Sequence, residues 1–284
     1  MKNSTQLKAL VRNLSEKSNV QAEVLLRNFM SERFLERVSA SEYKRNFILK
    51  GGMLIAAMVG IGTRNTMDMD ATLKGRTLAA PEITAIIEDI LRIPMDDGVE
   101  FTLRDIEEIR EEADYPGYRV SIGAIHDKTR QTLKVDITTG DFVTPKEIEY
   151  SYKLMFEDRA INIMAYNLET VLAEKFETII TRGVANTRMR DFYDIHVLTA
   201  TQPFSMDTFN SALDKTMQKR GTAEQISDAE ATLQMIAESP AMIDLWQRYR
   251  RRYVYAADVS WDMVIAAVKA LFTREITQIK IPLT

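Results

Sequence analysis

Two aspartates one residue apart are the strongest chemical signal in this chain. Asp68 and Asp70 are separated by Met69. Because alternate side chains of an extended strand point to the same face, both carboxylates are expected to emerge together. Two like charges on one face repel each other unless a cation lies between them. The spacing therefore predicts a binding site for a divalent metal ion.

A glycine pair precedes these aspartates in the chain. Gly51 and Gly52 follow Lys50 and open a segment with helical spacing, 53–59. Glycine lets a phosphate approach the backbone closely, and the start of a helix supplies N–H groups that have no partner within the helix. The pair is weak evidence by itself and is not a P-loop, because the spaced second glycine followed by Lys-Ser/Thr is missing. Together with the carboxylates, the pair indicates a site for a nucleoside triphosphate and its metal ion.

A third carboxylate is expected on a neighbouring strand. In the segment 132–137, the apolar side chains face one way and Asp136 faces the other. Three carboxylates suit Mg²⁺ or Mn²⁺ better than zinc, and such a site can hold two ions roughly 3.5–4 Å apart during nucleotidyl transfer. For Asp136 alone, a solvent-exposed position on a strand is the simpler interpretation. Only the combination of Asp68, Asp70 and Asp136 after a glycine turn favours catalysis.

A lysine and an aspartate further along the chain interrupt apolar helix faces. Lys175 falls within the apolar stripe of a helix predicted over 168–182, and Asp191 shares a face with apolar residues in the next predicted helix, 190–198. A charge on a buried face is costly unless it is paired or its tip reaches solvent. Two interpretations remain open: a structural ion pair between the two residues, or a lysine that reaches the triphosphate and an aspartate that fixes its position.

The elements that position these residues follow from hydrophobic periodicity. The first forty-odd residues are predicted to be helical, and the segment after residue 168 is mostly helical almost to the end. Between them, strands are expected over 67–73, 118–125 and 132–137, with a hairpin turn between the last two and a helix over 81–91. A domain boundary is placed near residue 155, which gives domains 1–155 and 156–284.

Composition limits the classes of function. The chain has 284 residues with 37 basic and 41 acidic side chains, a net charge of −4, so nucleic-acid contact requires a local basic patch. It has no cysteine and two histidines, which excludes thiolate chemistry and makes a histidine-rich metal site unfavourable. No apolar run approaches the roughly 20 residues that span a bilayer. We therefore expect a cytoplasmic protein without membrane contact.

One basic and aromatic run is a candidate for RNA contact. The segment 246–253 interleaves arginines with Trp246, Tyr249 and Tyr253. Such groups bind phosphates and stack on unpaired bases. The helical spacing of the aromatic residues nevertheless favours inward packing, with Arg248, Arg251 and Arg252 on a solvated face.

Five sequence pieces in order give the chain a family resemblance. They are Leu49-Lys50-Gly51-Gly52, Arg64-Asn65-Thr66-Met67-Asp68-Met69-Asp70, Val135-Asp136-Ile137 with Gly140-Asp141, Leu172-Ala173-Glu174-Lys175, and Arg188-Met189-Arg190-Asp191-Phe192-Tyr193-Asp194. Over most of residues 20–200 the chain resembles the AbiEii/AbiGii toxin family of nucleotidyltransferases, a branch of the DNA polymerase β-like superfamily. The resemblance implies an α+β fold: a nucleotidyltransferase-like mixed sheet flanked by helices, followed by a helical C-terminal domain that contributes Lys175 and Asp191 to the site.

The resemblance also implies roles for particular residues. It makes Asp68 and Asp70 metal ligands, with Asp136 as the less secure third, and assigns catalysis to these three with Lys175 and Asp191. The residues expected to contact the nucleotide are Lys50, Gly51, Gly52, Arg64, Thr66 and Lys175. The chain departs from the common pattern in having Gly52 where the superfamily often has serine, so the backbone must replace a hydroxyl contact, and in having methionines at 67 and 69.

The implied function is that of a toxin in a toxin–antitoxin or phage-defence pair. The enzyme would move NMP from an NTP to an RNA hydroxyl with Mg²⁺ or Mn²⁺ and release pyrophosphate. Some family members modify the 3′ end of tRNA, but acceptor choice varies within the family. A cognate antitoxin is an expected partner, with direct binding left open. Two alternatives remain: a nucleotide-binding regulator without transfer activity, and a transferase that acts on a protein side chain.

Overall fold

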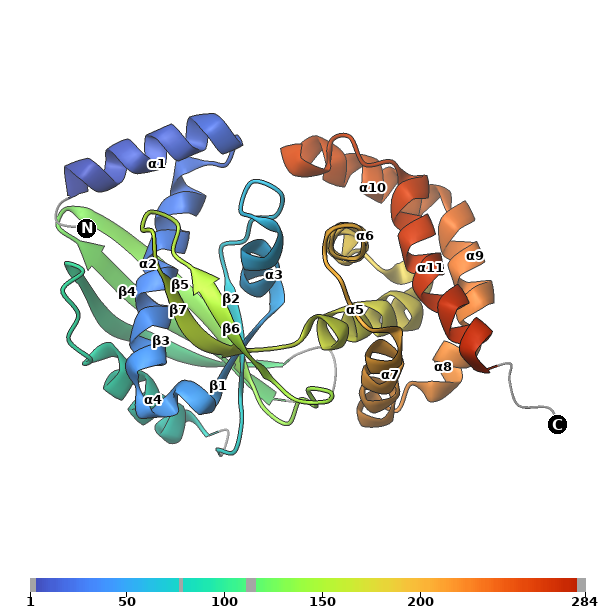
Figure 1. Ribbon diagram of the computed structural model, residues 1–284, viewed down its shortest axis with the longest axis horizontal. Helices are drawn as coiled ribbons and strands as arrows, with labels where there is room; N and C mark the ends of the chain where they lie inside the picture. The colour runs from blue at the N-terminus through green and yellow to red at the C-terminus, as the bar shows by residue number, and fades with distance from the viewer. Residues whose placement is uncertain (1–3, 77–78, 111–115, 280–284) are drawn as a thin grey trace. The chain divides into compact units, whose positions relative to one another are not determined.

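The computed structural model describes residues 4–76, 79–110 and 116–279 of the chain. Contacts divide the chain into two compact units. The sheet unit comprises residues 1–141 and 147–166, and the helical unit comprises 142–146 and 167–284. Figure 1 shows the strands in the first unit and the succession of helices α5 to α11 in the second.

A seven-stranded mixed sheet organises the sheet unit, in the order β3-β4-β5-β2-β1-β7-β6. The central strand β2 pairs antiparallel with β1 and parallel with β5, and β1 pairs parallel with β7. This arrangement confirms the mixed sheet flanked by helices that the resemblance implied. The strands are β1 (Phe47–Lys50), β2 (Met69–Leu73), β3 (Val99–Arg110), β4 (Pro116–His126), β5 (Thr129–Thr138), β6 (Ile148–Lys153) and β7 (Ala160–Ala165).

The structure confirms the strands predicted in the middle of the chain and adds others. The predicted strand over 67–73 begins at Met69, and the hairpin between β4 and β5 turns through Asp127 and Lys128, with Asp127 at φ 52°. Strands β1, β3, β6 and β7 were not predicted. Strands β3 and β6 lie at the two edges of the sheet, where polar side chains are common and the apolar alternation is weak.

Helices cover the sheet as the periodicity predicted. The described helices of this unit are α1 (Ser4–Ser18), α2 (Ala22–Ala40), α3 (Gly51–Val59) and α4 (Ala80–Leu91). Helix α2 contacts β5 and β7, and α4 contacts α2 and β3. The four isoleucines of α4 at 83, 86, 87 and 90 are all buried, which is the amphipathic pattern of a helix on a core.

The helical unit is built around α5, whose bounds match the prediction. Asn167 caps α5 by accepting a hydrogen bond from the Thr170 N–H at 3.0 Å, and Gly183 ends it at φ 50°. Helix α5 contacts α6 and α7, and the rings of Phe176 and Phe209 meet edge to face at 6.1 Å. The helices are α5 (Leu168–Arg182), α6 (Met189–Thr201), α7 (Met206–Arg220), α8 (Ala223–Ser227), α9 (Ala229–Glu238), α10 (Pro240–Arg252) and α11 (Trp261–Ile279).

The predicted boundary near residue 155 falls between two paired strands. Strand β6 ends at Lys153 and pairs antiparallel with β7, and the contact-based units change at Tyr166. As a division into separately folding domains, the boundary at 155 stays a prediction.

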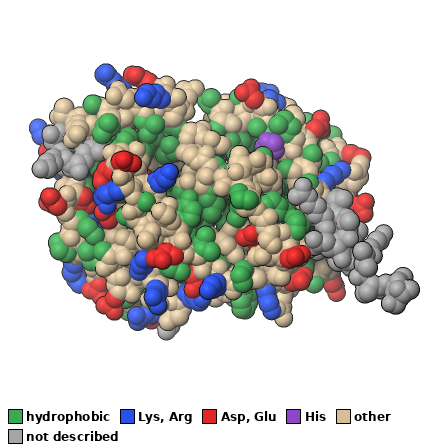
Figure 2. Space-filling model, viewed as in Figure 1, with side chains coloured by type: hydrophobic (Ala, Val, Ile, Leu, Met, Phe, Trp, Pro, Cys, Tyr) green, Lys and Arg blue, Asp and Glu red, His purple; other side chains and the backbone are tan. Residues whose placement is uncertain are grey.

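The surface is mixed in charge. Figure 2 shows acidic and basic side chains interspersed with hydrophobic ones on the viewed face, which agrees with the small net charge. Among the described residues, no helix has the length and apolar character needed to cross a membrane.

Candidate functional site

A row of four charged residues crosses one face of the sheet. The register pairs Lys50 of β1 with Asp70 of β2, Asp70 with Asp136 of β5, and Asp136 with Arg119 of β4. Residues directly opposite each other on neighbouring strands share a face and approach within about 5 Å. The sheet therefore places the two predicted aspartates between a lysine and an arginine, in a row that we call the charged row.

Arg119 holds one end of this row. Its Nε and Nη2 donate to the two carboxylate oxygens of Asp136 at 2.8 and 2.7 Å. This forked geometry is the strongest that an arginine and a carboxylate can adopt. The hydrogen bond to Asp136 raises the pKa of Arg119 above its usual range. Asp136 is therefore a partner of Arg119 in this structure, a relationship that required knowledge of the strand register.

Asp70 lies at the centre of the row and is electrostatically crowded. Burial raises the pKa of its carboxyl group above the ordinary value, and the nearby charges of Asp136 and Asp68 raise it further. Lys50 and the backbone N–H of Gly52 act in the opposite direction. A cation bound here would relieve the repulsion between the carboxylates and favour the ionised form of Asp70.

The carboxylates fit a metal ion in part. Asp68 is exposed and lies within electrostatic range of Asp70, so these two offer the oxygen donors that Mg²⁺ prefers. Within the described ranges, no three acidic or histidine side chains are grouped as a ligand set. Asp136 is engaged by Arg119 and would join Asp68 and Asp70 only if that ion pair opened.

The glycine pair packs directly against Asp70. Gly51 has φ +66°, and a Cβ atom at this position would lie 2.0 Å from Asp70 Oδ2. The N–H of Gly52 donates to the same oxygen at 3.4 Å. A Cβ atom on Gly52 would lie 2.9 Å from Thr66 Oγ1, so the serine common in the superfamily would not fit here without movement of Thr66. Glycine at both positions leaves room for the carboxylate and for the loop before β2.

Lys50 is held by a second polar cluster on the same face. Its Nζ donates to Asp141 Oδ2 at 2.7 Å and to Thr138 Oγ1 at 2.8 Å. The hydroxyl of Thr72 also donates to Asp141, at 2.6 Å, and lies 2.9 Å from the Tyr166 hydroxyl. Asp141 was noted in the sequence only as part of the family resemblance, without a role. The structure identifies it as the residue that fixes the lysine next to the glycines.

Arg64 and Thr66 shape the loop that leads into β2. The side chain of Arg64 is buried and donates to the Asn65 carbonyl. The amide of Asn28 in α2 donates to the Thr66 carbonyl at 2.9 Å, and Thr66 Oγ1 donates to the Asp68 carbonyl at 3.3 Å. These contacts give both residues a structural task, and their predicted contact with a nucleotide stays a prediction.

Lys175 and Asp191 form the ion pair that the helix faces predicted. Lys175 Nζ lies 2.7 Å from Asp191 Oδ1 and 2.8 Å from Asp194 Oδ2, and the side chains are 14%, 3% and 0% exposed, respectively. Arg188 contributes a further contact to Asp191 at 2.9 Å. The second carboxylate comes from Asp194, which was noted in the sequence as part of the family resemblance.

The net effect of this cluster is to favour the charged forms of Lys175 and Asp191. Burial opposes the charge on Lys175 and Asp191, but their mutual attraction outweighs it. The pKa of Lys175 is consequently raised and that of Asp191 is lowered, with help from Asp194 and Arg188 respectively. The pairing agrees with both interpretations of the sequence, a structural ion pair and a lysine that Asp191 positions for the triphosphate, and the role of the lysine stays a prediction.

Comparison with protein families decides the relationship. The model of the nucleotidyl transferase AbiEii toxin family, type IV toxin–antitoxin system, matches residues 33–267. The chain belongs to this family. The match includes every residue of the charged row and of the Lys175 cluster, and it confirms the resemblance drawn from the five sequence pieces. Among curated protein sequences, none matches the chain significantly.

Solved structures show the same fold. MenT4, a nucleotidyltransferase toxin from Mycobacterium tuberculosis H37Rv, superposes with a TM-score of 0.57 at 16% identity, covering 95% of this chain and 97% of that chain. A protein from H. pylori assigned to the nucleotidyltransferases superposes with a TM-score of 0.52 at 14% identity, covering 93% of this chain and 100% of that one. The helical C-terminal region is part of the shared architecture.

Membership of the AbiEii family fixes the general activity. The chain is a nucleotidyltransferase toxin of a type IV toxin–antitoxin system. The sequence predicted a nucleotidyltransferase toxin of a toxin–antitoxin or phage-defence pair, without the type of system. The family implies an NTP substrate and a cognate antitoxin.

Proposed function

We propose that this toxin transfers NMP from an NTP to a hydroxyl group of RNA and releases pyrophosphate. The observation that carries the proposal is the crowding of Asp70, whose carboxylate is packed against Gly51 and flanked by Asp136 and Asp68. A catalytic metal ion needs such a group of oxygen donors, and the glycines leave the adjacent backbone open to a phosphate.

The residues of the charged row are proposed to have different roles in phosphoryl transfer. Asp68 and Asp70 would hold the metal ion, with Asp136 as the third ligand once Arg119 has moved. When bound, Mg²⁺ or Mn²⁺ neutralises charge on the transferring phosphate and on the pyrophosphate that leaves. The N–H groups at the start of α3 and the ammonium group of Lys50 would receive the phosphates, since both are positive poles beside Asp70.

Lys175 is proposed to contribute a positive charge to the triphosphate. Its ammonium group is held by Asp191 and Asp194, and the raised pKa keeps it protonated at neutral pH. Phosphoryl transfer depends on in-line positioning and charge neutralisation, so a fixed cation supports it without taking part in proton transfer. Asp191 would be a positioning residue, since it would hold the ammonium group of Lys175 in place.

RNA is preferred over the other acceptors because the helical unit carries a concentration of arginines, although the net charge of the chain is negative. We propose that the reaction takes place in the cytoplasm, where NTP and RNA are abundant. Transfer to a protein side chain and nucleotide binding without transfer are the alternatives that the experiment must separate.

Incubation with each labelled NTP, Mg²⁺, and either total RNA or a protein extract separates these functions. Asp70→Asn keeps the size of the side chain and removes its charge, while Asp158→Asn changes an exposed aspartate in the same unit. We expect label on RNA with the wild type and the Asp158 variant, and loss of at least about a hundredfold with Asp70→Asn. Label on protein alone, or nucleotide binding without transfer, would overturn the proposal.

A further inference from the structure

A cavity in the helical unit is lined by arginines from two helices. Its volume is about 460 Å³, within the range of small-molecule sites. The start of α6 supplies one side, and the last turns of α10 supply the other. The charged lining residues are Arg188, Arg190, Arg248, Arg252 and Asp191.

The charges around this cavity do not cancel. Asp191 is shared between Lys175 and Arg188, while Lys175 also contacts Asp194. On α10, Arg248 pairs with Asp244. Of the charged residues that the structure describes in the lining, four are arginines and one is an aspartate, and these arginines include Arg190 and Arg252. Both of these arginines are exposed, so their guanidinium groups are accessible to a ligand.

Aromatic rings complete the wall of the cavity. Tyr249 and Tyr253 line it, with ring centroids 4.7 Å apart, and the guanidinium group of Arg252 lies 5.4 Å from the Tyr253 ring centroid. Tyr249 is buried and Tyr253 is half-buried. The Tyr253 ring also stacks on the Tyr255 ring, with centroids 5.3 Å apart. The wall therefore combines arginines with a packed, partly exposed aromatic surface, which is a combination suited to an unpaired base next to a phosphate.

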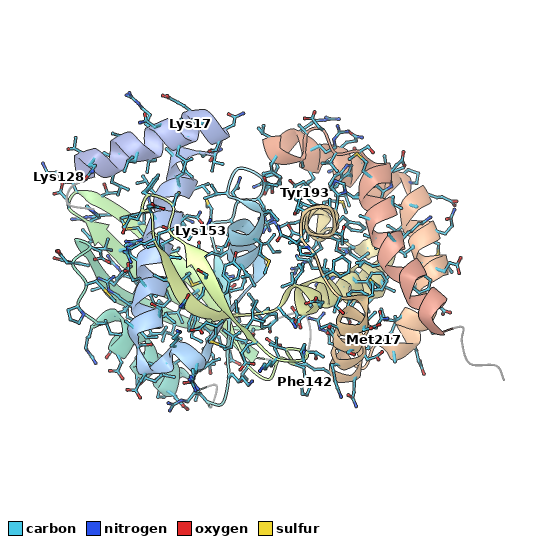
Figure 3. All side chains as sticks on the ribbon, viewed as in Figure 1. Lys17, Lys128, Phe142, Lys153, Tyr193 and Met217 are labelled. Atoms are coloured by element: carbon cyan, nitrogen blue, oxygen red, sulfur yellow. The ribbon has the colours of Figure 1, made fainter. Side chains whose placement is uncertain are left out.

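The wall is supported from behind by a packed aromatic cluster. Tyr193 of α6, labelled in Figure 3, lies 4.9 Å from the Tyr255 ring and 6.3 Å from the Tyr249 ring. The ring of Trp246 stacks on Tyr249 at 5.3 Å and is fully buried. These contacts join α6 to α10 and to the turn that follows it. The arginines are consequently displayed on a rigid support, which lowers the entropic cost of binding.

We propose that this arginine pocket binds phosphates and an unpaired base of the RNA strand that accepts the nucleotide. The proposal rests on the proposed function and adds a binding site for its acceptor. Phosphate groups of the NTP share the same chemistry. The RNA strand is favoured because the positive charges are spread over four arginines of two helices beside an aromatic face, an arrangement that matches successive phosphates and a base.

The basic and aromatic run, 246–253, has both an inward-packed side and an exposed basic side. Trp246 and Tyr249 pack inward, as their spacing predicted, and Arg248, Arg251 and Arg252 are exposed. Two of these arginines also face the start of α6 across the pocket, a relationship that a single helix cannot show. The predicted solvated face is therefore also one wall of a concave basic surface.

The test compares two double variants of equal charge. Arg248→Gln with Arg252→Gln removes two arginines of the pocket, and Arg251→Gln with Lys215→Gln removes two exposed cations of the same unit that do not line it. Affinity for a short single-stranded RNA is measured by fluorescence anisotropy at several salt concentrations. Affinity for NTP and transfer of label to RNA are measured in parallel.

We expect the pocket variant to bind RNA at least about tenfold more weakly than the control variant, with a salt slope smaller by about 1.4, since each phosphate contact in single strands contributes roughly 0.7. NTP affinity should stay within about twofold.

Equal RNA affinity in both variants, while the wild type labels RNA, would overturn the assignment of this pocket to RNA and leave the proposed function intact. A parallel loss of NTP affinity would assign the pocket to the triphosphate instead. A wild type that neither binds nor labels RNA would overturn both proposals.

Discussion

The carboxylate of Asp70 occupies the space that a side chain on Gly51 would need, because a Cβ atom there would lie 2.0 Å from Asp70 Oδ2. The positive φ of Gly51 and the absence of a side chain together let β2 deliver its aspartate to the first turn of α3. This contact places in one site the first two chemical signals of the sequence, the glycine pair and the aspartate pair.

Gly51→Ala is expected to abolish nucleotide transfer. It should also lower the free energy of unfolding by more than its backbone strain alone would. A left-handed conformation costs an alanine about 1–2 kcal/mol, and displacement of Asp70 adds to this. Gly60→Ala is the matched control, since Gly60 has φ +91° and no atom within 4 Å of its notional Cβ. Transfer rate and thermal unfolding are measured for both. Similar activity in the two variants would show that the contact with Asp70 is unimportant.

Arg119→Gln is expected to strengthen Mn²⁺ binding several-fold, because it releases Asp136 to join the other carboxylates. Arg130→Gln removes an exposed charge from the neighbouring strand β5 and serves as the control in a calorimetric titration. Adding Asp136→Asn to the Arg119 variant should cancel the gain. A gain that survives this second change would attribute the effect to the lost positive charge and exclude Asp136 as a ligand.

Lys175→Met is expected to lower the free energy of unfolding by about 3 kcal/mol, since it leaves two buried carboxylates with reduced compensation. The double variant Lys175→Met with Asp194→Asn should recover part of this stability, because Arg188 still pairs with Asp191. Urea denaturation measures the stability, and equilibrium binding measures the affinity for NTP. Affinity should remain low in the double variant. Recovery of nucleotide affinity along with stability would reduce Lys175 to a structural ion pair.

Glu32 should make stability dependent on pH. Burial raises its pKa from 4.5 to about 8, partly offset by the Met155 N–H, which donates to the carboxylate. The folded protein therefore holds this proton more tightly than the unfolded chain does. The contribution to stability is complete below the ordinary pKa of 4.5 and is lost as the pH rises towards 8.

The comparison of wild type with Glu32→Gln isolates this effect. Between about pH 5 and about pH 8, the wild type should lose stability relative to the variant by up to roughly 1.4 kcal/mol per pH unit. Glu23→Gln alters an exposed glutamate of the same helix and should show no such trend. A constant difference in unfolding free energy between wild type and Glu32→Gln across this range would contradict the raised pKa.

The sequence predicted what depends on local pattern. Helix α5 was placed with its observed ends, since its apolar stripe is a strong local signal. The carboxylates of Asp70 and Asp136 were expected on adjacent strands, and the register pairs them. Lys175 and Asp191 were recognised because a charge on an apolar helix face requires a partner.

The features that could not be predicted from the sequence depend on the order of the strands and on the packing of distant helices. Arg119 is the charged residue of the strand predicted over 118–125, and only the pairing of β4 with β5 shows that it faces Asp136. The edge strand β3 carries so many charged residues that its pattern resembles a solvated loop. The pocket between α6 and α10 likewise needs the packing of two helices that are distant in the chain, Met189–Thr201 and Pro240–Arg252.

The destination of the α-phosphate tests the proposed reaction most directly. Purified toxin is incubated with total RNA, Mg²⁺, and NTP labelled at either the α- or the γ-phosphate, with Asp70→Asn and Asp158→Asn in parallel. We predict that the α-label enters RNA, that the γ-label leaves with pyrophosphate, and that Asp70→Asn alone abolishes the transfer. Entry of the γ-label into RNA, or α-label transfer that persists in Asp70→Asn, would contradict nucleotidyl transfer at the charged row.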